Sequence, residues 1–248
     1  MRSSNDGHCM LAPVKPLLIL VTGEPLRFVL EVHGTFSDHV RKTVGAAWSG
    51  PWKTVDARVE PLPPLGDLSG ILITGSHASV TELSPWMQST AAWLRQAVVS
   101  GKPVLGLCFG HQLLGHAMGG EVRRHPAGPE NGTVPLDLLV ADKLLGPLLA
   151  QAPCVNMMHE DSVARLPPGA TVLARTAHEP HAALRFGTRA WGVQFHPEFD
   201  GSIVRSYLVG LRDQFRRAGR DPDRLLASAD DTPWAKAILG RFAAIAEG

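Results

Sequence analysis

The chain has 248 residues, of which 44% are hydrophobic and 19% are charged. This composition is typical of a globular protein and excludes an intrinsically disordered chain. The 24 Lys and Arg residues almost balance the 23 Asp and Glu residues, which leaves a formal net charge of +1. Because proteins that bind nucleic acid or anionic membranes carry a basic excess, this charge argues against both kinds of partner.

Cysteine usage and hydropathy favour a cytoplasmic location. The chain has three cysteines, Cys9, Cys108 and Cys154, an odd number that cannot form a disulfide framework. None of them has the Cys/His spacing of a zinc site, so we expect neither a metal nor a cofactor. The apolar run at residues 17–21 is far shorter than the roughly 20 residues that a membrane helix needs. We therefore expect a cytoplasmic protein with reduced thiols.

The first half of the chain alternates predicted strands with predicted helices. Residues 1–15 are polar and are expected to form a flexible leader. Wholly apolar runs predict strands buried on both faces of a parallel sheet, at residues 16–23, 70–76 and 103–108. Period-2 alternation predicts one more strand, at residues 53–59. Helical spacing predicts helices at residues 36–44, at 85–100 after an N-cap at Ser84, and from residue 109 to a stop at Gly119.

The second half changes in character. Residues 121–195 form short segments separated by turns, one of them predicted at Asn131–Gly132, and indicate a mainly antiparallel extension of the sheet. The C-terminal residues are expected to be helical, at residues 203–217, 222–229 and 233–246. We find no linker, so we expect one α/β domain at residues 16–248. It would have a mostly parallel central sheet and a helical C-terminal segment, residues 201–248.

Cys108 lies between Gly106 and Gly110, where an apolar strand runs directly into a helix. A G-x-C-x-G element in this position predicts a nucleophile elbow, because the flanking glycines allow the sharp turn that exposes the thiol. The helix N-terminus favours the thiolate, and the free backbone N–H of Phe109 is available to a developing oxyanion. The alternative, a buried core cysteine, is the usual fate of a lone cysteine, but the flanking glycines favour the nucleophile.

A thiol nucleophile needs a base and a group that orients the base. His196 ends an apolar strand, and Glu198 follows it across Pro197. If this segment is extended, the side chains at i and i+2 point the same way, so that Glu198 reaches one imidazole nitrogen while the other faces Cys108. Either residue alone has an ordinary structural explanation, whereas both together with an elbow cysteine indicate a catalytic triad.

These residues carry a resemblance to a known family. GLCFGHQ at residues 106–112 and GVQFHPEF at residues 192–199 resemble the two linked signatures of the class I glutamine amidotransferases. LITGSHASV at residues 72–80 is similar to the family's glycine turn, and HED at residues 159–161 is similar to its H-x-D segment. The helical tail resembles stand-alone members related to the amidotransferase domain of GMP synthase. The resemblance implies a three-layer, flavodoxin-like α/β fold.

The resemblance also implies a chemistry. Cys108 would attack the side-chain amide of glutamine to give a γ-glutamyl thioester, His196 would protonate the departing ammonia and then activate water, and Glu198 would orient His196. The remaining implied site residues are Gly75, Ser76 and Phe109 in the oxyanion hole, and Gln112, His159 and Asp161 at the amino-acid end of the substrate. The resemblance gives no metal ligand.

The chain departs from the family pattern around His159, where Met158 and Glu160 replace smaller residues. Glu160 either faces the substrate, which would favour another γ-glutamyl compound, or faces solvent. Asp161 either orients a substrate ammonium or caps a turn. Three functions stay open: an amidotransferase that passes ammonia to a separate synthase or acceptor subunit, a stand-alone γ-glutamyl peptidase or hydrolase, and a non-catalytic or partner-gated regulatory subunit. Each is compatible with an oligomer.

Overall fold

The computed structural model describes residues 14–149 and 151–248. The predicted leader, residues 1–15, therefore lies outside the described residues except for Val14 and Lys15, which are exposed and belong to no helix or strand. No helix in the described part of the chain has the length and apolar character needed to cross a membrane.

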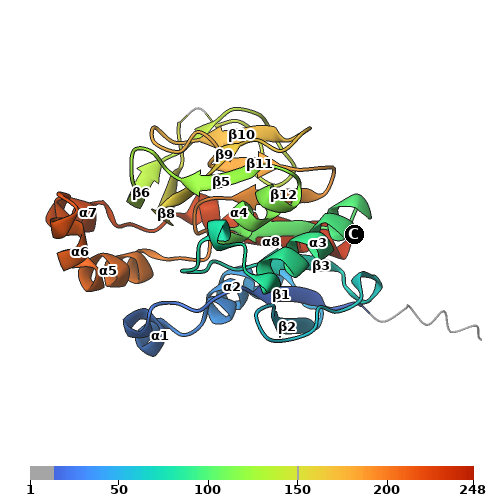
Figure 1. Cartoon of the computed structure of the whole chain (residues 1–248). Coiled ribbons are helices and arrows are strands. Elements are labelled where there is room, and N and C mark those ends of the chain that lie inside the picture. The colour runs from blue at the N-terminus through green and yellow to red at the C-terminus, as the bar shows by residue number, and fades with distance from the viewer. Residues whose placement is uncertain (1–13, 150) are drawn as a thin grey trace, which may run out of the picture.

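An eight-stranded sheet forms the centre of the protein (Figure 1). In spatial order its strands are β2 (Trp52–Asp56), β1 (Leu17–Val21), β3 (Gly70–Ile73), β4 (Val104–Leu107), β12 (Ala190–Val193), β11 (Ala183–Arg185), β10 (Thr171–Arg175) and β7 (Asp137–Leu138). The first five strands are parallel to one another and the last three pair antiparallel. This confirms the predicted mostly parallel sheet with an antiparallel extension.

Part of the predicted extension forms separate ribbons. Two antiparallel pairs stand outside the central sheet, β5 (Glu121–Arg124) with β9 (Asp161–Arg165) and β6 (Glu130–Pro135) with β8 (Cys154–His159). The turn predicted at Asn131–Gly132 is wrong, because both residues lie inside β6, opposite Met158 and Met157. Gly132 serves close packing here: a Cβ on it would lie 2.5 Å from the hydroxyl oxygen of Ser228.

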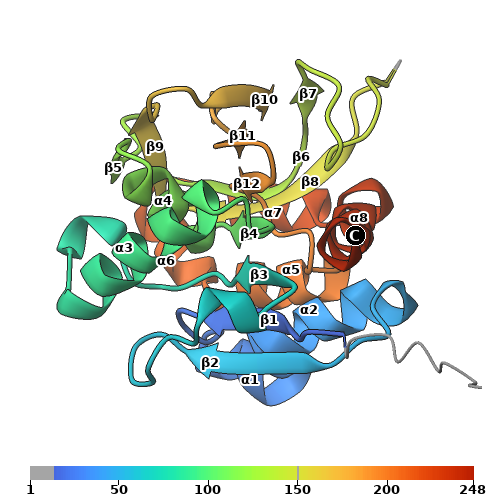
Figure 2. The same ribbon diagram turned by 90° about the vertical axis from the view of Figure 1, so that its right-hand side faces the viewer.

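Helices cover both faces of the sheet (Figure 2). The helices α2 (Phe36–Val44) and α8 (Pro233–Glu247) pack on one face, and α3 (Pro85–Val99) and α4 (Phe109–Ala117) pack on the other. Successive residues of a strand point to opposite faces. Leu17 and Ile19 of β1 accordingly join the first core cluster, and Leu18 and Leu20 join the second. The result is the expected three-layer α/β arrangement.

The other helices lie at one end of these layers (Figure 1). They are α1 (Arg27–His33), α5 (Gly201–Gly210), α6 (Arg212–Arg217) and α7 (Pro222–Ser228), and three short 3-10 helices occur at Gly45–Ala47, Leu65–Asp67 and Val80–Glu82. The sequence did not predict α1. The helix predicted at residues 203–217 is divided at Leu211 into α5 and α6. A third core cluster, built around Phe199, holds α1, α5 and α6 together.

Candidate active site

Cys108 lies at the turn between β4 and α4, as predicted. Its backbone has φ 49° and ψ −103°, a conformation that is strained for a residue other than glycine. The flanking glycines allow close packing: a Cβ on Gly106 would lie 2.4 Å from the carbonyl oxygen of Gly110, and one on Gly110 would lie 2.7 Å from that of Ile73. The chain can therefore turn from strand to helix within one residue.

The thiol of Cys108 is nearly buried and forms hydrogen bonds with two neighbours. It donates to the carbonyl oxygen of Met158, with Sγ and O 3.7 Å apart, and accepts from Nε2 of Gln194 at 3.6 Å. Gln194 is itself fully buried and accepts from Nε2 of Gln112 at 3.1 Å. These contacts fix the direction of the sulfur atom.

His196 and Glu198 form a buried pair, with Nδ1 and Oε1 2.8 Å apart. The extended segment that the sequence predicted is wrong. The N–H of Phe199 donates to the carbonyl oxygen of His196 at 3.3 Å, so residues 196–199 form a turn with proline at its second position, where proline is favoured. The turn still carries the Glu198 carboxylate to the imidazole.

The surroundings of His196 favour its protonated form. Burial lowers the pKa of His196, but the Glu198 carboxylate and a hydrogen-bonding contact with Cys108 outweigh burial and raise it to about 10. The imidazole also stacks on the ring of Phe199, with centroids 4.1 Å apart and planes 7° apart. The structure therefore places the His196–Glu198 pair beside Cys108 in one cavity.

Gly75, Ser76 and Phe109 each lie next to a member of the proposed triad or line its cavity. A Cβ on Gly75 would lie 3.2 Å from Cε1 of His196, so the loop after β3 packs directly on the ring. Ser76 lines the same cavity as Cys108. Phe109 is the first residue of α4, where a backbone N–H has no acceptor within the helix. An oxyanion hole formed by these residues stays a prediction.

Gln112, Asp161 and His159 were expected at the amino-acid end of the substrate, and all three line the cavity. Gln112 lines the cavity, and its Nε2 donates to the carbonyl oxygen of Asp161 at 2.8 Å. Asp161 also lines it, and its carboxylate accepts a hydrogen bond from the hydroxyl of Ser79.

The imidazole of His159 is turned into the protein. Its Nδ1 lies 2.9 Å from the carbonyl oxygen of Asp161 and its Nε2 lies 3.4 Å from Oε2 of Glu130. Both nitrogens therefore face protein atoms, and the side chain is 1% exposed. His159 nevertheless lines the cavity, so the expected contact of its segment with substrate stays a prediction that involves its backbone and not its imidazole.

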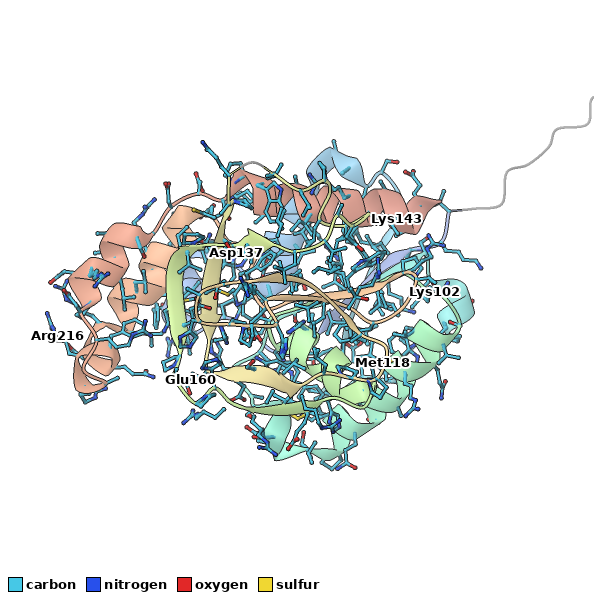
Figure 3. The ribbon with its side chains drawn as sticks, turned by 90° about the horizontal axis from the view of Figure 1, so that it is seen from above. Lys102, Met118, Asp137, Lys143, Glu160 and Arg216 are labelled. Atoms are coloured by element: carbon cyan, nitrogen blue, oxygen red, sulfur yellow. The ribbon has the colours of Figure 1, made fainter. Side chains whose placement is uncertain are left out.

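Glu160 has features of both positions considered for it, because it lines the cavity and is also partly exposed to solvent. Its side chain is 44% exposed, and it forms an ion pair with Arg124 of β5 at the rim of the cavity. Its charge is therefore balanced by a partner and partly hydrated. Glu160 and Arg216, both labelled in Figure 3, lie toward the same end of the molecule, where residues of α6 also line the cavity.

A cavity of about 760 Å³ joins these groups. Sequence reasoning missed several side chains that line it or support it, namely Arg124, Gln194, Tyr207, Leu211 and Phe215. A polar residue inside the apolar run AWGVQF was a usable signal for Gln194. The other four come from elements whose placement beside Cys108 depends on long-range packing.

Comparisons with known proteins agree with this arrangement. Residues 50–209 match the family model described as glutamine amidotransferase class-I. A glutamine-hydrolyzing GMP synthase of Aeropyrum pernix is 40% identical over 148 residues, which cover 60% of this chain and 27% of that protein. A glutamine amidotransferase-like protein of Schizosaccharomyces pombe is 26% identical over 218 residues, which cover 79% of this chain and 84% of that protein. The chain spans less than a third of the length of the GMP synthases that it matches.

Solved structures show the same fold. The crystal structure of a glutamine amidotransferase from Methylobacillus flagellatus superposes with a TM-score of 0.71 at 27% identity, covering 94% of this chain and 93% of that one. One from Thermotoga maritima superposes with a TM-score of 0.73 at 20% identity, covering 94% and 99%.

Proposed function

Because the chain belongs to the class I glutamine amidotransferase family, we propose that it hydrolyses the side-chain amide of glutamine or of a γ-glutamyl compound through a thioester on Cys108. The observation that carries this proposal is the buried His196–Glu198 pair, which lies in the same cavity as the elbow residue Cys108. A nucleophile, a base and an orienting carboxylate within reach of one another are what acyl transfer requires.

In the first half of the reaction, the Cys108 thiol gives its proton to His196, the sulfur attacks the γ-carbonyl carbon and the carbonyl oxygen becomes an oxyanion. The N–H of Phe109 and the backbone of Gly75 and Ser76 are positioned to stabilise this charge. The C–N bond then breaks as protonated His196 gives its proton to the leaving nitrogen. Ammonia or an amine departs, and the γ-glutamyl group stays on sulfur.

In the second half, water attacks the thioester and His196, now neutral, accepts a proton from it. The C–S bond breaks as His196 returns this proton to the sulfur, which releases glutamate and restores the thiol. Glu198 holds the imidazole through Nδ1 and stabilises its cationic form in both halves. Gln112 and Asp161 form the side of the cavity that we assign to the amino-acid end of the substrate.

Two functions differ in what happens to the released nitrogen. The chain would either pass ammonia to a separate synthase subunit or act alone as a γ-glutamyl hydrolase. The volume of the cavity favours the second version, because it exceeds what one small amino acid fills. A non-catalytic role conflicts with the strained elbow and the buried His196–Glu198 pair. We further propose that residues 16–248 act as one unit in the cytoplasm, where Cys108 stays reduced.

The test is release of glutamate from glutamine and from γ-glutamyl methylamide. We expect Cys108→Ala to lower turnover by about 10⁴-fold or more, as loss of a triad nucleophile does elsewhere. The matched control is Cys154→Ala, which removes an exposed free thiol and should leave turnover unchanged. Equal turnover by wild type and Cys108→Ala would refute the proposal.

A further inference from the structure

We infer that the preferred substrate is a γ-glutamyl amide with an apolar amine part, and that α5 and α6 form the wall that binds this part. The inference rests on the proposed function at Cys108. It adds the chemical class of the leaving amine and the residues that select it.

The first support is the extent of the cavity. Its volume of about 760 Å³ falls within the range of about 300–1,000 Å³ typical of sites that enclose a drug-sized ligand. From Cys108 and His196 it continues along the helical segment, where Tyr207, Leu211 and Phe215 line it. A substrate that fills it must extend beyond the γ-glutamyl group.

The second support is the direction of this extension. His196 protonates the leaving nitrogen, so the substituent on that nitrogen lies on the His196 side of the scissile bond. On this side the imidazole stacks on Phe199, and Phe199 stacks on Tyr207 of α5 with centroids 5.5 Å apart. The stack leads from the reacting atoms to the wall formed by α5 and α6, so that wall faces the amine part.

The third support is the character of the wall. Leu211 and Phe215 line the wall, and Leu26 before α1 lines the same cavity; all three pack within or against the core cluster around Phe199, so their positions are fixed before substrate binds. Apolar side chains that are already ordered lose little conformational entropy when they bind an apolar group.

The fourth support is the distribution of charge around the cavity. Among the described lining residues, Arg124 is the one Lys or Arg side chain, and it is paired with Glu160 on the polar side. On the helical side, His77 lies beside Tyr207, and burial together with the neighbouring His196 lowers the pKa of His77. Gln214 is neutral and exposed. A charged amine part would lose hydration against this wall without gaining a partner.

Two neutral probes test this selectivity, γ-glutamyl methylamide and γ-glutamyl benzylamide. For wild type we expect kcat/KM to be about tenfold or more higher for the benzylamide, the discrimination that added apolar bulk brings in a hydrophobic pocket. Leu211→Glu should lower the benzylamide-to-methylamide ratio about tenfold. Each variant is compared with wild type by this ratio, so the intrinsic difference between the two leaving amines cancels in the comparison.

Matched controls separate the wall from general damage to the helices. Val209→Glu makes the same change on α5 at a side chain that is 56% exposed and does not line the cavity, so it should keep the wild-type ratio. Ala218 is exposed and lines the wall, so Ala218→Phe is not expected to disturb folding. This variant should lower the ratio. Arg217→Phe, at the neighbouring exposed residue that does not line the cavity, should leave the ratio unchanged.

The outcomes distinguish this inference from the function on which it rests. Cys108-dependent turnover of both probes at equal kcat/KM would overturn the inference and leave the proposed function standing. An unchanged ratio in both Leu211→Glu and Ala218→Phe would also overturn it. No turnover of either probe or of glutamine would overturn both.

Discussion

His196 keeps a positive charge in a fully protein-enclosed position. Burial alone disfavours an imidazolium, yet the pKa of His196 rises to about 10 because the Glu198 carboxylate and the neighbouring Cys108 side chain stabilise the cation. An imidazolium is the form that donates a proton to a leaving nitrogen. Glu198 and Cys108 therefore keep His196 in the form that acts as the general acid in the first chemical step.

This charge predicts a pH dependence of stability. The pKa of His196 is raised above its ordinary 6.5, so the stabilisation is fully present below pH 6.5 and is lost as the pH rises toward about 10. We expect the free energy of unfolding of wild type relative to Glu198→Gln to decrease over that window, as measured by urea unfolding at several pH values. The exposed carboxylate of Glu247 gives the control, since Glu247→Gln should show a constant difference. A Glu198→Gln difference that grows with pH would contradict the assignment.

Some single-residue roles could be predicted from the sequence and others could not. Cys108, His196 and Glu198 stand in two short segments whose glycine and proline residues already restrict the backbone. The orientation of the His159 imidazole could not be predicted in this way, because its neighbours Glu130 and Glu179 come from distant parts of the chain. The segment around Pro197 shows a smaller error. Glu198 was correctly predicted as the partner of His196, but the backbone between them forms a turn and is not extended.

At the scale of elements, the junction between β4 and α4 decides where the thiol points. Gly106 of β4 touches the backbone of Gly110 in the first turn of α4, and Gly110 touches β3. The apolar runs predicted β1, β3 and β4 well, because a strand buried on both faces leaves a clear pattern in sequence. The pairing of β6 with β8 left no such pattern, and a local turn signal at Asn131–Gly132 was overridden by packing against α7.

Gly106→Ala tests this junction. The new methyl group would overlap the Gly110 backbone, which cannot move without displacing α4, so we expect unfolding to become easier by about 1–3 kcal/mol. Turnover of glutamine should fall as well, since Cys108 moves with α4. A Cβ on Gly66 would meet no atom within 4 Å, and Gly66→Ala should change stability by no more than about 0.5 kcal/mol. Equal effects of the two substitutions in urea unfolding would show that the junction is not tightly packed.

At the scale of the whole molecule, the C-terminal segment has two separate roles. The helix α8 places Ile238 and Phe242 in the main core, against the face of the sheet that α2 also covers. The helices α5 and α6 instead extend the cavity away from Cys108. Helical periodicity predicted most of this segment, but it could not distinguish these roles, because each depends on which distant element a helix contacts.

The covalent γ-glutamyl intermediate on Cys108 is the central claim, and mass spectrometry tests it most directly. Wild type, Cys108→Ala and Cys154→Ala would each be mixed with γ-glutamyl benzylamide, quenched in acid during turnover and digested. We predict a mass increase of one γ-glutamyl group on the peptide that contains Cys108, in wild type and Cys154→Ala alike. Turnover without this adduct, or with the adduct on Cys154, would contradict the mechanism.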